Sequence, residues 1–432
     1  MIAYYLDLAR RSFRRNVGLT ILMVLAIAFG VGASMTTLTV LHVLSVDPIP
    51  QKSHVLYRVQ LEPRPLPGYR PGEEPPQQLT RADGEALWRE NRADRRALMA
   101  SGRAAIEPDR TGMQPFFVDS RWTSTDFFPM FDVPFVAGAP WSADDDARAT
   151  HVVVIGRALA EKLFGTAMVA GRTVRVAGFD MRIVGVTDTW RPVPHFFDLD
   201  NGPFTQGEEL FMPFSTSREL KLDHGGMTDC YQTADDQDAL GAPCVWVQFW
   251  VELDSDAKLA AYDDFLVHYS NDQRAAGRFG RPTNVRLRDV IEWLAYNHVV
   301  PDDARLQSWI ALGFLLVCLV NTVGLLLTKF LRRSGEIGVR RALGASRRSI
   351  FMQLLVESGA IGIAGGVLGL GLAWLGLWAV RQQPAGYADL AQLDPRMLAL
   401  TLGLAVGSSL LAGVLPAWRG CQVPPALQLK SN

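Results

Sequence analysis

The sequence predicts a membrane protein with four transmembrane α-helices, arranged as one followed by three, and a large α+β extracytoplasmic domain between the first and the second. Four stretches carry this prediction because they contain no Asp, Glu, Lys or Arg, or a single acid: residues 16–46, 306–328, 349–380 and 397–418. About 20 apolar residues suffice to cross a bilayer. The long segment between the first two stretches contains no such run, so we expect it to fold outside the membrane.

The first predicted span covers residues 17–46. A helix from Val17 to Leu44 would be about 42 Å long, which exceeds the ~30 Å hydrocarbon core, so it should tilt or project beyond the membrane. A cleavable signal peptide is the alternative, since arginines precede the stretch and small residues lie within it. The length favours the span, because the apolar region of a signal peptide has about 7–15 residues.

Residues 1–16 are predicted to form a cytoplasmic amphipathic helix. At 100° per residue, the apolar side gathers Ile2, Tyr5, Leu6, Ala9 and Phe13, and the opposite side gathers Asp7, Arg10, Arg11, Arg14 and Arg15. This pattern is typical of helices that lie in the membrane interface. Such a helix would be a simple anchor or a second contact for a cytosolic partner.

Residues 47–305 mix strand and helix signals, which predicts an α+β domain. Strands are expected at Tyr57–Leu61, His151–Ile155, Thr173–Val176, Arg182–Val186, Glu209–Phe214 and Trp246–Leu253. Helices are expected at Arg81–Met99, Arg157–Phe164 and Asp256–Asn271. Prolines and glycines crowd residues 63–76, which indicates a loop.

The remaining spans are predicted at residues 306–328, 349–380 and 397–418. Basic residues precede the first span and crowd the connection at 329–348, whereas the connection before the fourth span is balanced in charge. The positive-inside rule then places both termini, the basic connection and the tail at 419–432 in the cytoplasm.

The basic connection is predicted to contain a short helix. Ser334 can cap its start, Gly344 can end it, and Ser346 can cap the third span. The helix would be either a positively charged anchor or a rigid lever that passes a partner's movement into two spans.

Glu357 is the single acid within the predicted third span. A carboxylate there is costly, so it indicates a functional site unless it snorkels to the interface or pairs with a basic residue of the connection. Both interpretations stay open. Gly362 and Gly366 belong to a glycine-rich run after Glu357, which favours a helix-packing seam over a substrate path.

No motif indicates catalysis. The chain has no zinc-protease, serine-hydrolase or phosphate-binding loop signature, and its net charge of −1 does not favour nucleic acid. The acidic run Asp144–Asp146 is more typical of a solvated loop than of a site. The aromatic residues between Trp122 and Phe131 are more typical of a core than of a ligand platform.

Cys230 and Cys244 both fall in the expected outer domain. An oxidising compartment favours a disulfide between them. Two free thiols, or a metal site that includes His224, are the alternatives. Cys318 and Cys421 lie in or near spans and are expected to pack as apolar residues.

The motif Glu-Ile-Gly-Val-Arg-Arg-Ala-Leu-Gly-Ala at residues 336–345 resembles the hallmark of FtsX-domain permeases of the MacB type, which are membrane subunits of ABC transporters. The similarity continues through weaker motifs at Gln353–Glu357, Leu415–Ala417, Thr125–Phe128, His151–Gly165 and Ile183–Val186. The order of one span, an outer domain and three spans is also that of the family.

The resemblance implies a dimeric, non-catalytic permease in the bacterial inner membrane, formed with a second copy or a paralogue. A separate cytosolic ABC ATPase would bind ATP and Mg²⁺ and move the periplasmic domain, a process called mechanotransmission. Glu336, Ile337, Arg340, Arg341 and Gly344 would form the coupling helix on that ATPase. The implied function is efflux of amphipathic compounds or peptides with a periplasmic adaptor and an outer-membrane channel. Lipoprotein release or control of an extracytoplasmic hydrolase is the alternative.

Overall fold

The computed structural model describes residues 13, 16–109, 112–383, 386–392 and 395–422. The chain divides into two compact units: the segments before Val46 and from Val300 onward form one, and Val46–Val299 forms the other. The predicted amphipathic helix at 1–16, apart from Phe13 and Asn16, and the tail beyond residue 422 lie outside the described residues.

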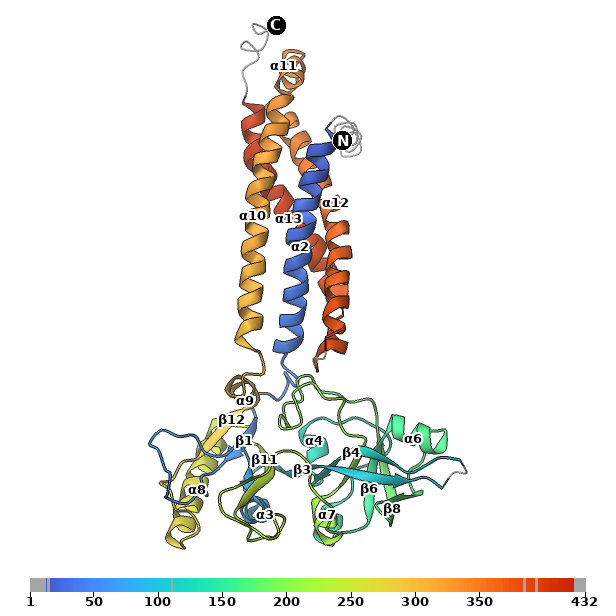
Figure 1. The fold of residues 1–432 in the computed structure, drawn as a ribbon, viewed down its shortest axis with the longest axis vertical. Coiled ribbons are helices and arrows are strands. Elements are labelled where there is room, and N and C mark those ends of the chain that lie inside the picture. The colour runs from blue at the N-terminus through green and yellow to red at the C-terminus, as the bar shows by residue number, and fades with distance from the viewer. Residues whose placement is uncertain (1–12, 14–15, 110–111, 384–385, 393–394, 423–432) are drawn as a thin grey trace. The chain divides into compact units, whose positions relative to one another are not determined.

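The first unit is a bundle of long helices that run side by side (Figure 1). Four of them are long and apolar enough to cross a membrane: α2 (Val17–Ser45), α10 (Asp302–Arg332), α12 (Arg347–Arg381) and α13 (Pro395–Cys421). Helices α10, α12 and α13 are longer than the predicted spans 306–328, 349–380 and 397–418. The additional turns at their ends contain charged and polar residues. Two short helices connect them: α11 (Ser334–Ala342) and η1 (Ala388–Leu390).

Glycines in α12 allow its neighbours to pack closely. A Cβ atom at Gly362 would overlap the Ser409 side chain of α13, and one at Gly365 would lie 2.8 Å from Ile27 of α2. Neither position has room for a larger residue. The glycine run is therefore a packing seam, as the sequence predicted.

The second unit is built on one mixed sheet of 12 strands in the order β12-β1-β11-β3-β4-β9-β6-β8-β5, with β2 and β10 beside β11 and β7 beside β3 and β8. The strands are β1 (Leu56–Gln60), β2 (Leu79–Thr80), β3 (Arg95–Glu107), β4 (Phe116–Thr123), β5 (Phe135–Gly138), β6 (Val152–Gly156), β7 (Thr173–Val176), β8 (Phe179–Thr187), β9 (Leu210–Pro213), β10 (Asp229–Cys230), β11 (Cys244–Glu252) and β12 (Arg286–Asp289). Among the strands of the described residues, only the pairs β4–β9 and β6–β8 are parallel.

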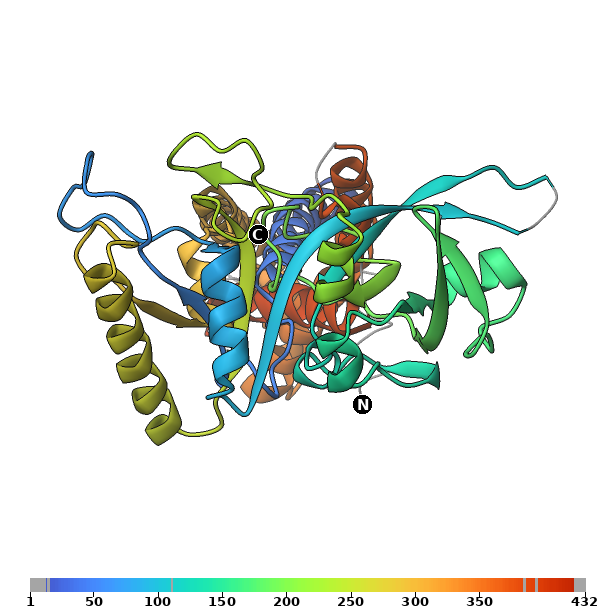
Figure 2. The same ribbon diagram turned by 90° about the horizontal axis from the view of Figure 1, so that it is seen from below.

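Helices surround this sheet, as the α+β prediction requires. They are α3 (Arg81–Glu90), α4 (Phe127–Met130), α5 (Ala143–Ala147), α6 (Arg157–Phe164), α7 (Phe214–Glu219), α8 (Asp256–Ala275) and α9 (Val290–Tyr296). Strand β3 joins two halves, since it pairs first with β11 and then with β4. Figure 2 shows α3 on one side of β3 and α5 and α7 on the other.

The helix expected over Arg81–Met99 is wrong beyond Glu90. Asn91 takes the left-handed conformation, with φ 51°, and ends α3. The following residues form β3, where Ala97 and Met99 face one core and Leu98 and Ala100 face the other. The spacing of charged residues predicted a helix up to Met99, but pairing with the neighbouring strands makes the residues from Arg95 onward a strand.

Both faces of the sheet are covered by apolar cores. Phe127, Phe128 and Phe131 are buried in one of them, and Trp122 is buried in the other. Several aromatic pairs meet edge to face, as between Phe127 and Phe131 at 5.0 Å. The prediction that this aromatic run belongs to the core is confirmed.

Candidate functional site

The short helix α11 lies between the spans α10 and α12. Gly344 follows it with φ +98°, which reverses the chain, and the Ser346 hydroxyl accepts a hydrogen bond from the Ser349 N–H to cap α12. Ser334 is the first helical residue instead of the cap, a position taken by Arg333. These residues set where α11 begins and ends between α10 and α12.

The two faces of α11 differ sharply. Ile337 is buried against the apolar core of the bundle. Val339 is 56% exposed and Leu343 is 83% exposed. Large apolar side chains on the outer face of a short, basic connection are available to a partner protein.

The charged residues of the hallmark motif have different partners. Arg340 donates to Glu336 at 2.9 Å and to Gln353 of α12 at 3.0 Å. Arg341 instead donates to the Cys421 carbonyl at the end of α13, at 3.4 Å. The structure thus brings Glu336 and Arg340 together and separates them from Arg341.

Glu357 is buried in the bundle and is paired with two cations. Its carboxylate oxygens lie 2.8 Å from Lys329 Nζ and 3.0 Å from Arg333 Nη1. Lys329 is completely buried and also donates to Thr20 of α2 at 3.3 Å. Pairing with the basic connection, one of the two open interpretations, is therefore present. Both cations, Lys329 and Arg333, belong to the basic connection predicted at 329–348.

The outer unit contains its own buried ion cluster. Arg121 of β4 contacts Asp198 at 2.5 Å and also pairs with Glu208. Burial alone would raise the pKa of the Glu208 carboxyl, but the Arg121 charge and hydrogen bonds outweigh burial and lower it to about 2. No local motif indicates this cluster, because its members are far apart in sequence.

Cys230 and Cys244 form a disulfide that joins β10 to β11. His224 lies nearby but contacts Asp238 and stacks on Trp246. Among the described residues, no group of His, Cys, Asp and Glu side chains is arranged to hold a metal ion. Cys318 and Cys421 are buried free thiols.

The three aspartates of the acidic run Asp144–Asp146 differ in how deeply they are buried. Asp144 is exposed and Asp145 is half-buried, whereas Asp146 is buried and accepts hydrogen bonds from the Thr125 N–H and the Trp141 ring N–H. Burial raises the pKa of the Asp146 carboxyl to about 7. Because both carboxylate oxygens accept hydrogen bonds, this acid has a structural role.

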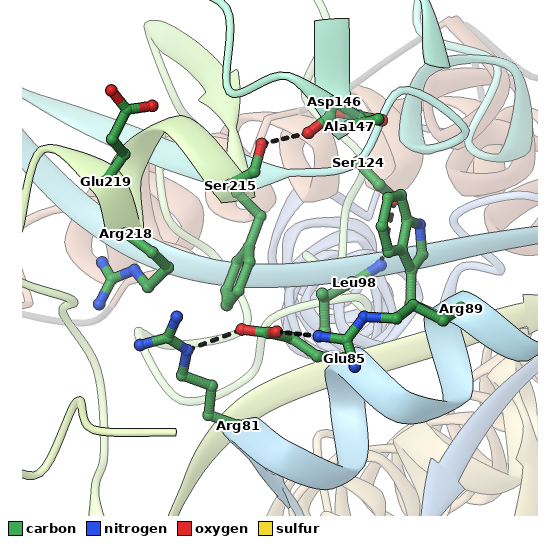
Figure 3. Close-up of a pocket in the computed structure, with 12 residues that line it drawn as sticks. Arg81, Glu85, Arg89, Leu98, Ser124, Asp146, Ala147, Ser215, Arg218 and Glu219 are labelled. Carbon is green, nitrogen blue, oxygen red and sulfur yellow. Dashed lines mark hydrogen bonds and ion pairs between the residues drawn. The ribbon is translucent and has the colours of Figure 1, made fainter. Parts of the chain in front are cut away.

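A cavity of about 400 Å³ lies over β3, between α3 on one side and α5 and α7 on the other. Figure 3 shows Arg81, Glu85 and Arg89 projecting from α3, and Arg218 and Glu219 from α7. Its apolar lining consists of Trp88, Leu98 and Phe214. An apolar lining with a charged rim suits an amphipathic ligand or a peptide segment.

Two family models cover most of the chain. The model of the MacB-like periplasmic core domain matches residues 20–266, and that of the FtsX-like permease C-terminal region matches residues 308–425. The chain belongs to the MacB/FtsX family of ABC-transporter permeases. The prediction of this family from the motif at residues 336–345 is thereby confirmed.

Curated relatives of this permease are similar over different shares of the chain. The macrolide export ATP-binding/permease protein MacB of Rhodospirillum rubrum is 25% identical over 99% of this chain and 60% of its own length. The pyoverdine export ATP-binding/permease protein PvdT of Pseudomonas aeruginosa is 23% identical, over 85% and 50%. MacB of Bdellovibrio bacteriovorus is 23% identical, over 68% and 41%. The permease thus spans about half the length of these relatives.

A solved structure is similar to part of this chain. The periplasmic region of MacB from Actinobacillus actinomycetemcomitans matches 57% of this chain and 93% of its own, with a TM-score of 0.36 and 13% identity.

Proposed function

We propose that this permease works with a separate cytosolic ABC ATPase and transmits ATP-driven movement to its outer domain. The two-faced helix α11 carries the proposal, since it is anchored to the bundle through Ile337 and exposes Val339 and Leu343. ATP and Mg²⁺ would be bound by the ATPase. The permease itself would contribute no catalytic group.

The proposed orientation places both termini and α11 in the cytoplasm and the outer domain in the periplasm. The distribution of basic residues supports this orientation. The disulfide between Cys230 and Cys244 agrees with it, because disulfides persist in oxidising compartments. The membrane would be the bacterial inner membrane.

The proposed cargo is an amphipathic compound or a peptide that leaves the cell. The names of relatives that export macrolides and pyoverdine support efflux. The cavity between α3 and α7 could receive such a molecule. A second permease copy or a paralogue would complete the membrane part, with a periplasmic adaptor and an outer-membrane channel beyond it. Lipoprotein release, or control of an extracytoplasmic hydrolase, is the alternative.

The substitution Leu343→Glu tests the docking face. Charge on this exposed apolar position should weaken ATPase binding at least tenfold and abolish stimulation of ATP hydrolysis, without unfolding the permease. The matched control is Leu240→Glu, at a half-exposed leucine of the outer domain. Both variants would be reconstituted with the ATPase in nanodiscs. Equal binding by both would contradict α11 as the docking site.

A further inference from the structure

Five charged side chains form a continuous chain at the end of the bundle where α11 lies. In order they are Lys329, Glu357, Arg333, Glu336 and Arg340, and we call them the charge chain. Successive members are in contact at 2.8, 3.0, 3.3 and 2.9 Å. The charge chain begins at Lys329 in the last turn of α10 and ends at Arg340 on α11.

The charge chain holds α11 against α12 at two points. Glu357 binds Arg333, at the junction of α10 and α11, and Gln353 accepts from Arg340 at 3.0 Å. Gln353 and Glu357 lie one helical turn apart on the same face of α12. Glu336 contacts both arginines, so the two attachments are joined.

Separating the buried pair Lys329 and Glu357 would cost much free energy. The Lys329 side chain is 0% exposed and that of Glu357 is 2% exposed. Separating them would leave charges without compensation in an apolar bundle, which is strongly unfavourable. Lys329 also contacts Thr20 of α2 and the ring of Phe13, so the N-terminal span is tied to the same point.

We propose that the charge chain makes α11 and the adjoining ends of α10 and α12 one rigid body, so that a push on α11 moves both spans together. Without the charge chain, the backbone would bend at Arg333 and Gly344, and α11 would move without α10 and α12. Lys329, Arg333 and Glu357 are then positioning residues for coupling. This inference rests on the proposed function, since it assigns a mechanical role to the docking helix.

The first test measures rigidity in the permease alone and is therefore independent of the ATPase. Spin labels at Ala342 of α11 and Met352 of α12, in a background in which Cys318 and Cys421 are serine, would report one narrow distance distribution in nanodiscs. Glu357→Gln should broaden that distribution at least twofold. The control Arg348→Gln, at an exposed arginine of α12, should leave it narrow. An unchanged distribution in Glu357→Gln would overturn the inference.

The second test separates mechanical coupling from simple packing. The double variant Lys329→Met with Glu357→Leu removes both buried charges and should fold with the melting temperature of the wild type. We expect this variant to bind the ATPase as the wild type does. Its stimulation of ATP hydrolysis should be at least tenfold lower than that of the wild type. Full stimulation would show that the charge chain only fills space.

The two proposals can fail separately. If the wild-type permease neither binds nor stimulates the ATPase, the proposed function is wrong, while the distance measurement still decides whether the charge chain is rigid. Should Glu357→Gln fail to fold, Arg340→Met breaks the attachment to Gln353 at a partly exposed position. It should broaden the distance distribution to a smaller extent, and no broadening would contradict the two-point attachment.

Discussion

Each of the two units of this permease buries an ion cluster. The cluster of the outer unit lies within one sheet domain, whereas that of the helical unit connects separate helices. In the outer unit, Arg121 neutralises Asp198 and Glu208 within one folded sheet domain. In the helical unit, Glu357 joins side chains from separate helices. The first arrangement stabilises one folded domain, whereas the second connects helices that we propose move together. We therefore propose that buried ion pairs stabilise the outer unit and transmit movement in the helical unit.

The largest effect is expected when the outer cluster is broken. Arg121→Met leaves Asp198 and Glu208 buried without their cation, which should lower the free energy of unfolding of the outer domain by about 3–5 kcal/mol. Urea unfolding of the full chain in nanodiscs, followed by tryptophan fluorescence, measures this loss. The control is Arg103→Met, because Arg103 pairs with Asp119 at the surface and should contribute less than about 1 kcal/mol. A loss no larger than the control's would remove the distinction between the clusters.

Acid should weaken the outer unit through the same cluster. The folded-state pKa of Glu208, about 2, lies below the ordinary glutamate value, and that of Asp198 is also lowered. Their stabilising contribution is complete above the unfolded-state pKa values, near 4, and is lost as the pH falls toward 2. Urea unfolding midpoints between pH 6 and pH 2.5 would record this decline. A flat profile would mean that folding does not lower the pKa values of these two carboxyl groups.

The disulfide should matter less than the ion cluster. It joins cysteines 14 residues apart in sequence, and closing a loop of that size stabilises a fold by about 3 kcal/mol. Cys230→Ser with Cys244→Ser should therefore lower the urea midpoint of the outer unit and leave ATPase stimulation intact. Cys318→Ser is the matched control, at a free thiol of the bundle. Loss of stimulation in the disulfide variant would show that the outer unit contributes to coupling.

The smallest expected effect concerns the packing seam. Gly362→Leu must displace Ser409 of α13, at a cost of about 1–3 kcal/mol. Gly371→Leu is the control, because a Cβ atom at Gly371 of the same helix meets nothing within 4 Å. Thermal denaturation in detergent should show a lower midpoint for Gly362→Leu only. Equal midpoints would mean that α12 and α13 can separate without loss.

Sequence predicted the helical unit more completely than the outer unit. Spans are visible because an apolar run needs no distant partner, and Glu357 stood out against such a background. Arg121, Asp198 and Glu208 were invisible, because only the sheet brings them together. The sequence also left open which face of α11 turns outward, for a related reason. Only packing against the bundle determines that Ile337 lies inward and Leu343 outward.

The most direct test of the central claim is to purify the tagged full chain from its native cell in mild detergent and to identify its companions by mass spectrometry. We predict an ABC ATPase in stoichiometric amount, which Leu343→Glu should release. An adaptor in the same complex would support efflux, and lipoproteins would support the alternative. Recovery of a folded permease without any ATPase would contradict the account.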